Sequence, residues 1–165
     1  MARDHARLKC SIWSDSDFTS LPASAQRTYF LALSQPGLTY AGVVSYTPGR
    51  WSRLAAGTSP AAIRKDIRAL EDAGYVVVDE GTEELLIRTF VKHDGIMKQP
   101  HVARAMVKAA NGIVSPAVRE AFRSALLDLH RERLANPPKP KDGEEPKQDG
   151  WSVEGLAELL SGGQR

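Results

Sequence analysis

Three basic side chains, those of Arg64, Lys65 and Arg68, lie within five residues of one another. Their segment, 60–72, has apolar residues spaced by four and then three positions, which is typical of a helix with one apolar face. The basic side chains would lie on the opposite face, together with Ala61. Arginine can bind the edge of guanine with two hydrogen bonds, and a small side chain lets a helix approach a groove closely. The chemistry that this face indicates is recognition of a nucleic-acid duplex.

Residues before this segment could add contacts of the same kind. Thr58 and Ser59 precede the expected helix, where hydroxyls and N-terminal amides can bind phosphate. A short basic helix lies before them, where helix-turn-helix proteins usually touch the DNA backbone. The candidate DNA contacts are therefore Arg50, Arg53, Thr58, Ser59, Ala61, Arg64, Lys65 and Arg68. The alternative is a solvated helix face without a ligand, because residues 50–78 carry only a small excess of basic over acidic side chains.

Few other residues have the types or spacing of a catalytic or metal site. His93, Asp94 and His101 could be drawn together as an acid–base or metal site, but scattered groups on loop-like sequence are more often surface residues. Cys10 is the single cysteine, which excludes an internal disulfide and a cysteine-based zinc cluster. The sequence contains no phosphate-binding loop, nucleophile elbow or zinc-protease histidine pair. We therefore expect no enzyme activity, no cofactor and no metal.

The elements that would hold the basic face are indicated by turn and cap residues. Ser20 or Ser24 can cap a helix that ends near residue 34. A short strand is expected over 42–46, and a short helix with proline in its first turn over 48–55. The aromatic side chains of this half, Trp13, Tyr29, Phe30 and Trp51, fit core positions better than a surface for stacking bases.

Two β-rich runs, 75–78 and 85–91, are joined by a turn that contains Gly81 and predict a hairpin. A short helix, a turn and an amphipathic helix followed by a hairpin are typical of a winged helix-turn-helix. The tip of this wing carries only acidic charges, from Asp79, Glu80, Glu83 and Glu84. A phosphate backbone would repel them. We therefore expect the helix, and not the wing tip, to bind DNA.

Two more helices are expected, over 99–110 and from Ser115-Pro116 to about residue 134. The second has an apolar stripe that either the rest of the chain or another copy must cover, and we favour a homodimer. The stripe consists of Val118, Phe122, Leu126 and Leu129. Residues 88–133 carry a net positive charge, and Lys98, Arg104 and Lys108 are candidate secondary phosphate contacts. The alternative, which we favour slightly, is a solvated face around helices that complete the core or oligomerise.

The last thirty residues differ in composition from the rest. Residues 136–150 contain four prolines and no strongly apolar residue, which predicts a disordered linker. A short amphipathic helix is expected over 151–160 in the tail 151–165, and a helix this short folds in water only by docking. Its apolar face consists of Trp151, Val153, Leu156, Leu159 and Leu160. A partner groove and the chain's own domain are both possible docking surfaces, and we favour a partner.

A pattern of core and turn residues over residues 8–98 resembles a known family. It is carried by the runs Ser11–Phe18, Ala25–Tyr29, Gly42–Val44, Arg50–Ala55 and Ile67–Val76, with Leu21. The pattern is similar to the N-terminal winged-helix domain of phage replisome-organiser proteins, and similar helix-turn-helix proteins occur in phages of actinobacteria. The resemblance implies binding of double-stranded origin DNA and recruitment of a helicase or helicase loader, here through the C-terminal tail. A separate loader-binding domain is not expected.

Length and composition agree with a single small domain and an appendage. The chain has 165 residues, a net charge of +2 and 42% hydrophobic residues. Its longest apolar runs are far shorter than the roughly 20 residues that a membrane span needs, so no membrane contact is expected and the bacterial cytoplasm is the expected location. The fold class is mainly α with a small β-hairpin. The expected organisation is a winged helix over 1–98, a helical extension over 99–135, the linker 136–150 and the tail 151–165.

The expected function is sequence-specific binding of double-stranded DNA in phage replication initiation. A phage or prophage transcriptional repressor is the first alternative, because the same reading helix would serve both roles. A protein-interaction adaptor that binds no DNA is an alternative of another class.

Overall fold

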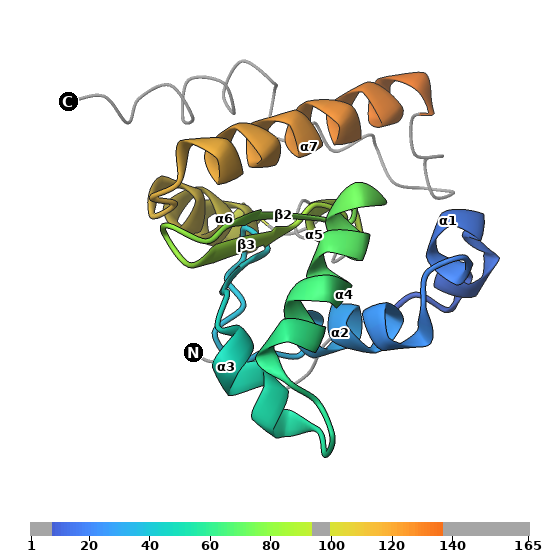
Figure 1. The fold of residues 1–165 in the computed structure, drawn as a ribbon. Coiled ribbons are helices and arrows are strands. Elements are labelled where there is room, and N and C mark those ends of the chain that lie inside the picture. Colours follow the sequence, from blue (N-terminus) through green and yellow to red (C-terminus); the bar gives the residue numbers. More distant parts are fainter. Residues whose placement is uncertain (1–7, 94–99, 137–165) are drawn as a thin grey trace.

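The structure is a computed structural model that describes residues 8–93 and 100–136 (Figure 1). It is mainly helical, with a small three-stranded antiparallel sheet. The elements of the first half are η1 Cys10–Ser14, α1 Ser16–Thr19, α2 Ala23–Leu33, β1 Val43–Ser45, α3 Pro48–Trp51, η2 Ser52–Leu54 and α4 Pro60–Asp72. They are followed by β2 Val76–Asp79, β3 Glu84–Ile87, α5 Phe90–His93, α6 Pro100–Asn111 and α7 Pro116–Ala135. The expected linker and tail lie outside the described residues.

Serine caps begin the two long helices α4 and α7. The hydroxyl of Ser59 accepts the Ala62 N–H, and that of Ser115 accepts the Val118 N–H, both at 3.2 Å. Each serine is followed by a proline in the first helical turn, whose missing N–H costs the helix nothing. The predicted starts of both helices are confirmed.

The predicted cap of α2 is wrong. Pro22 precedes this helix, and no side chain caps it. Ser20 follows the last residue of α1, and its hydroxyl instead donates to the carbonyl of Asp17 in that helix. The Ser24 hydroxyl donates to the carboxylate of Asp66 in α4. Ser24 therefore makes a contact between two helices instead of capping its own. Its position in the sequence does not distinguish these two roles.

The sheet has the strand order β1-β3-β2, with both pairs antiparallel. The hairpin of β2 and β3 was expected, and β1 adds a third strand by pairing Val43 with Leu86. The second run of the hairpin is shorter than predicted, because β3 ends at Ile87 and Phe90 begins the helical turn α5. Periodicity does not separate a strand from a helical turn in so short an apolar run.

Helices cover both faces of the sheet. In Figure 1, α7 lies across one face, and α4 and α2 lie on the other. Three successive residues of β3, Leu85, Leu86 and Ile87, are fully buried as a result. A strand covered on both sides reads as a continuous apolar run rather than an alternating one.

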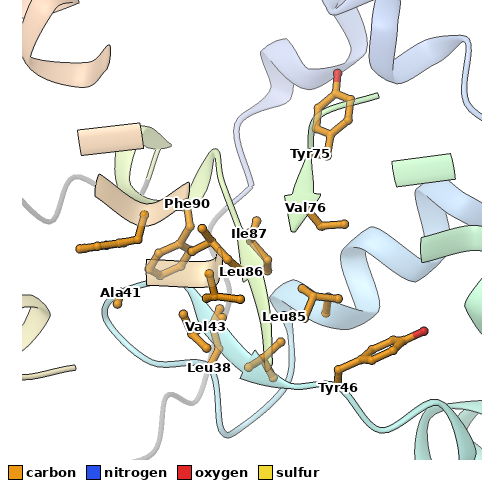
Figure 2. Close-up of a cluster of buried hydrophobic side chains, with 14 of the residues drawn as sticks. Leu38, Ala41, Val43, Tyr46, Tyr75, Val76, Leu85, Leu86, Ile87 and Phe90 are labelled. Atoms are coloured by element: carbon orange, nitrogen blue, oxygen red, sulfur yellow. The ribbon is translucent and has the colours of Figure 1, made fainter. Parts of the chain in front are cut away.

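The core continues from β1 through β3 to α5. Figure 2 shows the side chains of Val43, Leu86 and Phe90 gathered on these elements. Gly42 has a φ of +78°, and a Cβ atom added there would lie 2.8 Å from the Cβ of Phe90. Only glycine permits both the left-handed backbone and this close contact.

Of the four aromatic residues predicted in the core, three lie in it or against it. Trp51 and Tyr29 are buried and Phe30 is half-buried. The prediction is wrong for Trp13, which is 56% exposed and packs only the edge of its ring near Phe18 and Phe30. It lies in η1, a short 3-10 helix that buries none of its residues.

The stripe of α7 is covered by the chain itself. Val118 and Phe122 are completely buried, Leu126 nearly so, and Leu129 packs against the same cluster. Met106 of α6 belongs to that cluster too, so the two rear helices complete the core of the sheet and the front helices. Among the described residues, no helix is long and apolar enough to cross a membrane.

Candidate nucleic-acid interface

Helix α4 buries one face and exposes the other. Ile63, Ile67 and Leu70 are buried against α2, α3 and the sheet. The opposite face consists of Ala61, Arg64, Lys65 and Arg68, all of them exposed. The structure therefore brings together on one helix face the four residues that the sequence assigned to it.

Asp66 is the polar member of the buried face. Its carboxylate accepts the Ser24 hydroxyl at 2.7 Å and the Thr28 hydroxyl at 2.8 Å, and both donors lie in α2. A buried carboxylate is costly unless such donors satisfy it. These bonds fix the rotation of α4 about its own axis, and with it the direction of the basic side chains. Sequence reasoning missed Asp66, whose position at i+3 from Ile63 and i−4 from Leu70 was the available signal.

Arg64 and Arg68 lie on the flank of α4 that faces Tyr46. Burial raises the pKa of the Tyr46 hydroxyl, Glu80 raises it further, and the two arginines lower it. These charges are therefore close enough to Tyr46 to act on it. Glu80 stands at the tip of the hairpin, so one acidic group of the hairpin lies near the basic flank of α4.

The turn before α4 holds the remaining predicted contacts. Arg50 and Arg53 are exposed in α3 and η2, and Thr58 is half-buried. Gly57 has a φ of +72°, a left-handed conformation that suits glycine. Ser59 is exposed, but its hydroxyl oxygen already accepts the Ala62 N–H, so its part in the interface is first to cap the helix.

The basic side chains of this surface are not neutralised within the part of the chain that the structure describes. There, no hydrogen bond or ion pair involves the charged groups of Arg50, Arg53, Arg64, Lys65 or Arg68. Exposed cations without internal partners can exchange bound counterions for DNA phosphates. The surface that these five side chains form is therefore positively charged and accessible to a ligand.

The acidic hairpin is attached to the start of α7. The carboxylate of Glu84 accepts the N–H of Val114 at 3.0 Å and that of Ser115 at 2.7 Å. Asp79 lies opposite Glu84 in the sheet, and hydrogen bonding from Ser115, followed by the N–H groups of the turn, lowers the pKa of Asp79. Two of the four acidic residues therefore bind protein donors, while Glu80 and Glu83 are exposed.

The rear helices keep fewer cations for a ligand than the sequence suggests. Lys92 pairs with Glu132, and Arg131 pairs with Asp128. The Arg119 guanidinium donates to the carbonyl of Ile113. Of the three candidate secondary contacts, Arg104 and Lys108 are exposed one turn apart on α6, and Lys98 lies outside the described residues. The predicted partner-binding residues of the tail also lie outside them.

The described ranges were compared with the requirements of a metal site and of a small-molecule cavity. They contain no group of three or more His, Cys, Asp and Glu side chains that could hold a metal ion. A cavity of about 110 Å³ lies between η1, α2 and α5. Its phenols are engaged, because Tyr75 donates to Asp15 and the Tyr29 hydroxyl bonds with that of Thr89, both at 2.8 Å. Small-molecule sites are usually about 300–1,000 Å³, so this cavity is too small for a typical ligand.

Comparison with known proteins adds no relative on which a function could be based. No family model, no curated protein and no solved structure matches this chain. The assignment of function rests on the residues and their geometry.

Proposed function

We propose that this chain is a winged helix-turn-helix protein that binds double-stranded DNA in a sequence-specific manner, with α4 in the major groove. The observation that carries the proposal is the exposed face of α4, where Ala61, Arg64, Lys65 and Arg68 lie together with no partner for the three charges among residues 8–93 and 100–136. A helix of this diameter fits the major groove, and arginine on such a face can read guanine. Arg50 and Arg53 would contact phosphates beside it.

The order of the elements supports the winged-helix assignment. A first helix, a strand, a short helix, the reading helix and a hairpin follow one another as α2, β1, α3, α4, β2 and β3. The short helix and the reading helix pack together across a turn, as in helix-turn-helix proteins. Since α7 and the hairpin are joined through Glu84, the hairpin serves the core, and the proposal gives it no DNA contact.

We further propose initiation of phage DNA replication as the biological role. This part rests on the resemblance of residues 8–98 to replisome-organiser domains. Origin binding would place the protein where a helicase or its loader is recruited. A transcriptional repressor would use the same helix, so the discriminating measurement is direct binding of purified host helicase and loader to the full-length protein on DNA.

The first test is a mobility shift with random-sequence duplex at low and moderate salt, followed by selection of preferred sequences. Arg64→Ala is expected to relax the preference at one base pair, at a cost of about 1–3 kcal/mol, because Arg64 lies in the part of the helix that reads bases. Lys65 is expected to behave like Arg64. Arg68→Ala should weaken all sequences evenly and lower the slope of log K against log salt by about 0.9, as expected for one lost phosphate contact.

Asp72→Ala is the control on the same helix, because Asp72 is exposed beyond the basic residues and should matter little. If the Arg64, Lys65 and Arg68 triple alanine variant stays folded and binds as well as the unaltered protein, α4 is not the reading helix. If the unaltered protein binds no duplex at either salt concentration, the adaptor function replaces DNA binding.

A further inference from the structure

Arg27 is an exposed arginine of α2 that lies beside the turn leading into α4. Its Nη2 donates a long hydrogen bond, 3.4 Å, to the carbonyl of Leu54, the last residue of η2. A guanidinium has five N–H donors, so this bond leaves most of them for another acceptor. In the part of the chain that the structure describes, no carboxylate pairs with Arg27. The side chain is therefore held near the front surface while its charge is open to a ligand.

Helix α4 has two flanks, and its own arginines lie on one of them. Asp66 marks the flank that faces α2, because α2 supplies both of its hydroxyl donors. Arg64 and Arg68 each lie two residues from Asp66, which is about 160° around a helix of 3.6 residues per turn. They point to the opposite flank, where they act on Tyr46.

On the flank that faces α2, α4 exposes two opposite charges at the outer edge, those of Lys65 and Asp72, besides the buried contact. Ala62 is exposed there, and Ala69 is half-buried. Arg27 reaches this side of α4 through its bond to Leu54, just before the turn that leads into the helix. It adds a positive charge from α2 to a side on which Lys65 and Asp72 of α4 offset each other.

We infer that Arg27 binds a backbone phosphate of double-stranded DNA on the side of α4 opposite to Arg64 and Arg68. The inference rests on the proposed function. A major groove is about 12 Å wide and has a phosphate backbone along each edge. A helix lying in it needs positive charge on both flanks, and Arg27 makes the second contact. The bond to Leu54 orders the side chain in advance, which reduces the entropy lost on binding.

The test is Arg27→Gln in the full-length chain, with fluorescence anisotropy of a random-sequence duplex measured over a series of salt concentrations. Glutamine carries no charge, and the position is exposed with a single long hydrogen bond, so thermal unfolding should be nearly unchanged. The slope of log K against log salt should fall by about 0.9, and sequence preference should stay the same. Arg131→Gln is the matched control, because Arg131 is an exposed arginine of α7 on the other side of the sheet.

The result is decisive in each direction. An unchanged slope for a folded Arg27→Gln variant overturns the inference, and so does an equal fall for Arg131→Gln, which would indicate a general charge effect. If Arg27→Gln unfolds, Arg27→Met takes its place, because its long apolar side chain keeps the stem without the charge. A slope lower by about 0.9 for the folded variant then supports the phosphate contact, and an unchanged slope overturns it. If only the α4 triple variant loses binding, the proposed function stands and Arg27 has no part in it. Absence of duplex binding by the unaltered protein overturns both.

Discussion

The buried carboxylate of Asp66 links α4 to α2, and its loss is expected to reduce stability. Asp66→Asn keeps the shape of the side chain but removes the charge that two hydroxyls bind. We expect the free energy of unfolding to fall by about 1–3 kcal/mol in urea denaturation. Asp72→Asn on the exposed side of the same helix should change it by less than about 0.5 kcal/mol. Equal effects of the two substitutions would show that Asp66 does not fix α4.

The hydroxyl of Tyr75 gives the protein a dependence on alkaline pH. Burial raises the pKa of Tyr75 above its usual value, and the hydrogen bond to Asp15 and the charge of that carboxylate raise it further. In the unfolded chain the phenol ionises near pH 10, so above that pH the folded state holds more protons. Its contribution to stability is complete below pH 10 and declines as the pH rises.

Melting temperatures between pH 8 and 11 test this dependence. Tyr75→Phe should lose stability at pH 8 but show a smaller further decline between pH 9.5 and 11 than the unaltered protein. Tyr40→Phe is the control, since Tyr40 is exposed. An identical alkaline decline in Tyr75→Phe and the unaltered protein would be inconsistent with a role of this phenol.

The carboxylate of Glu84 links the hairpin to the backbone just before α7. Glu84→Gln can accept only part of what the carboxylate accepts from Val114 and Ser115, so the free energy of unfolding should fall by about 1–3 kcal/mol. Glu83→Gln at the exposed tip should leave it nearly unchanged. Chemical denaturation of both variants measures the difference.

The same pair of substitutions bears on DNA binding. Because the wing tip is expected not to bind DNA, neutralising Glu83 should leave the affinity unchanged or raise it slightly. A lower affinity of Glu83→Gln would contradict the placement of DNA on α4 alone. Glu84 is unsuitable for this purpose, since its replacement also disturbs the core.

The elements that could be predicted are those with strong local signals. A serine followed by a proline predicts the starts of α4, at Ser59, and of α7, at Ser115, because the cap and the first turn lie within four residues of each other. The pairing of β1 with β3 joins residues far apart in the sequence, which no local pattern encodes. The same holds for the proposed DNA-binding surface. Its α4 residues could be assigned from periodicity, whereas Arg27 reaches it only through the packing of α2 on α4.

The role of Asp66 was missed, and a cap at Ser24 was wrongly predicted, for one physical reason. A serine accepts an N–H at a helix start or donates to a carboxylate on another helix with equal ease. Which of the two occurs depends on the tertiary partner, here Asp66 on α4. Likewise Trp13 has the large aromatic side chain that is typical of a core residue, but it lies in a short 3-10 helix that buries none of its residues.

The surface of α7 that the chain itself buries bears on the association state of the whole protein. The stripe of α7 that suggested a homodimer is buried within the chain, and of the large apolar side chains of α7 that the structure describes, Leu127 is the exposed one. A specific interface buries about 800 Å² on each partner, far more than one leucine provides. We expect light scattering at high micromolar concentration to report a monomer. A dimer there would require an interface outside α7.

Deletion of residues 136–165 tests how the tail is used. If its apolar residues bind a partner, such as a helicase or its loader, the melting temperature of the shortened protein should be nearly unchanged. Docking on the chain's own domain predicts a loss of several degrees instead. Replacing Trp151 and Leu156 by serine in the full-length chain should reproduce the result of the deletion in either case.

The pairing of Val43 with Leu86 has a consequence for how often α4 opens to solvent. Both α3 and α4 lie within the stretch of chain that this pairing closes, and α7 seals the sheet from the other side. The buried residues of α4 also belong to the same core cluster as those of β3, so opening that released α4 would expose this cluster, and we expect the helix to open only in global unfolding. Its backbone amides would then exchange with solvent as slowly as those of β3. A surface held in this way meets its ligand already ordered, and association would proceed by collision of rigid bodies rather than by folding on the ligand.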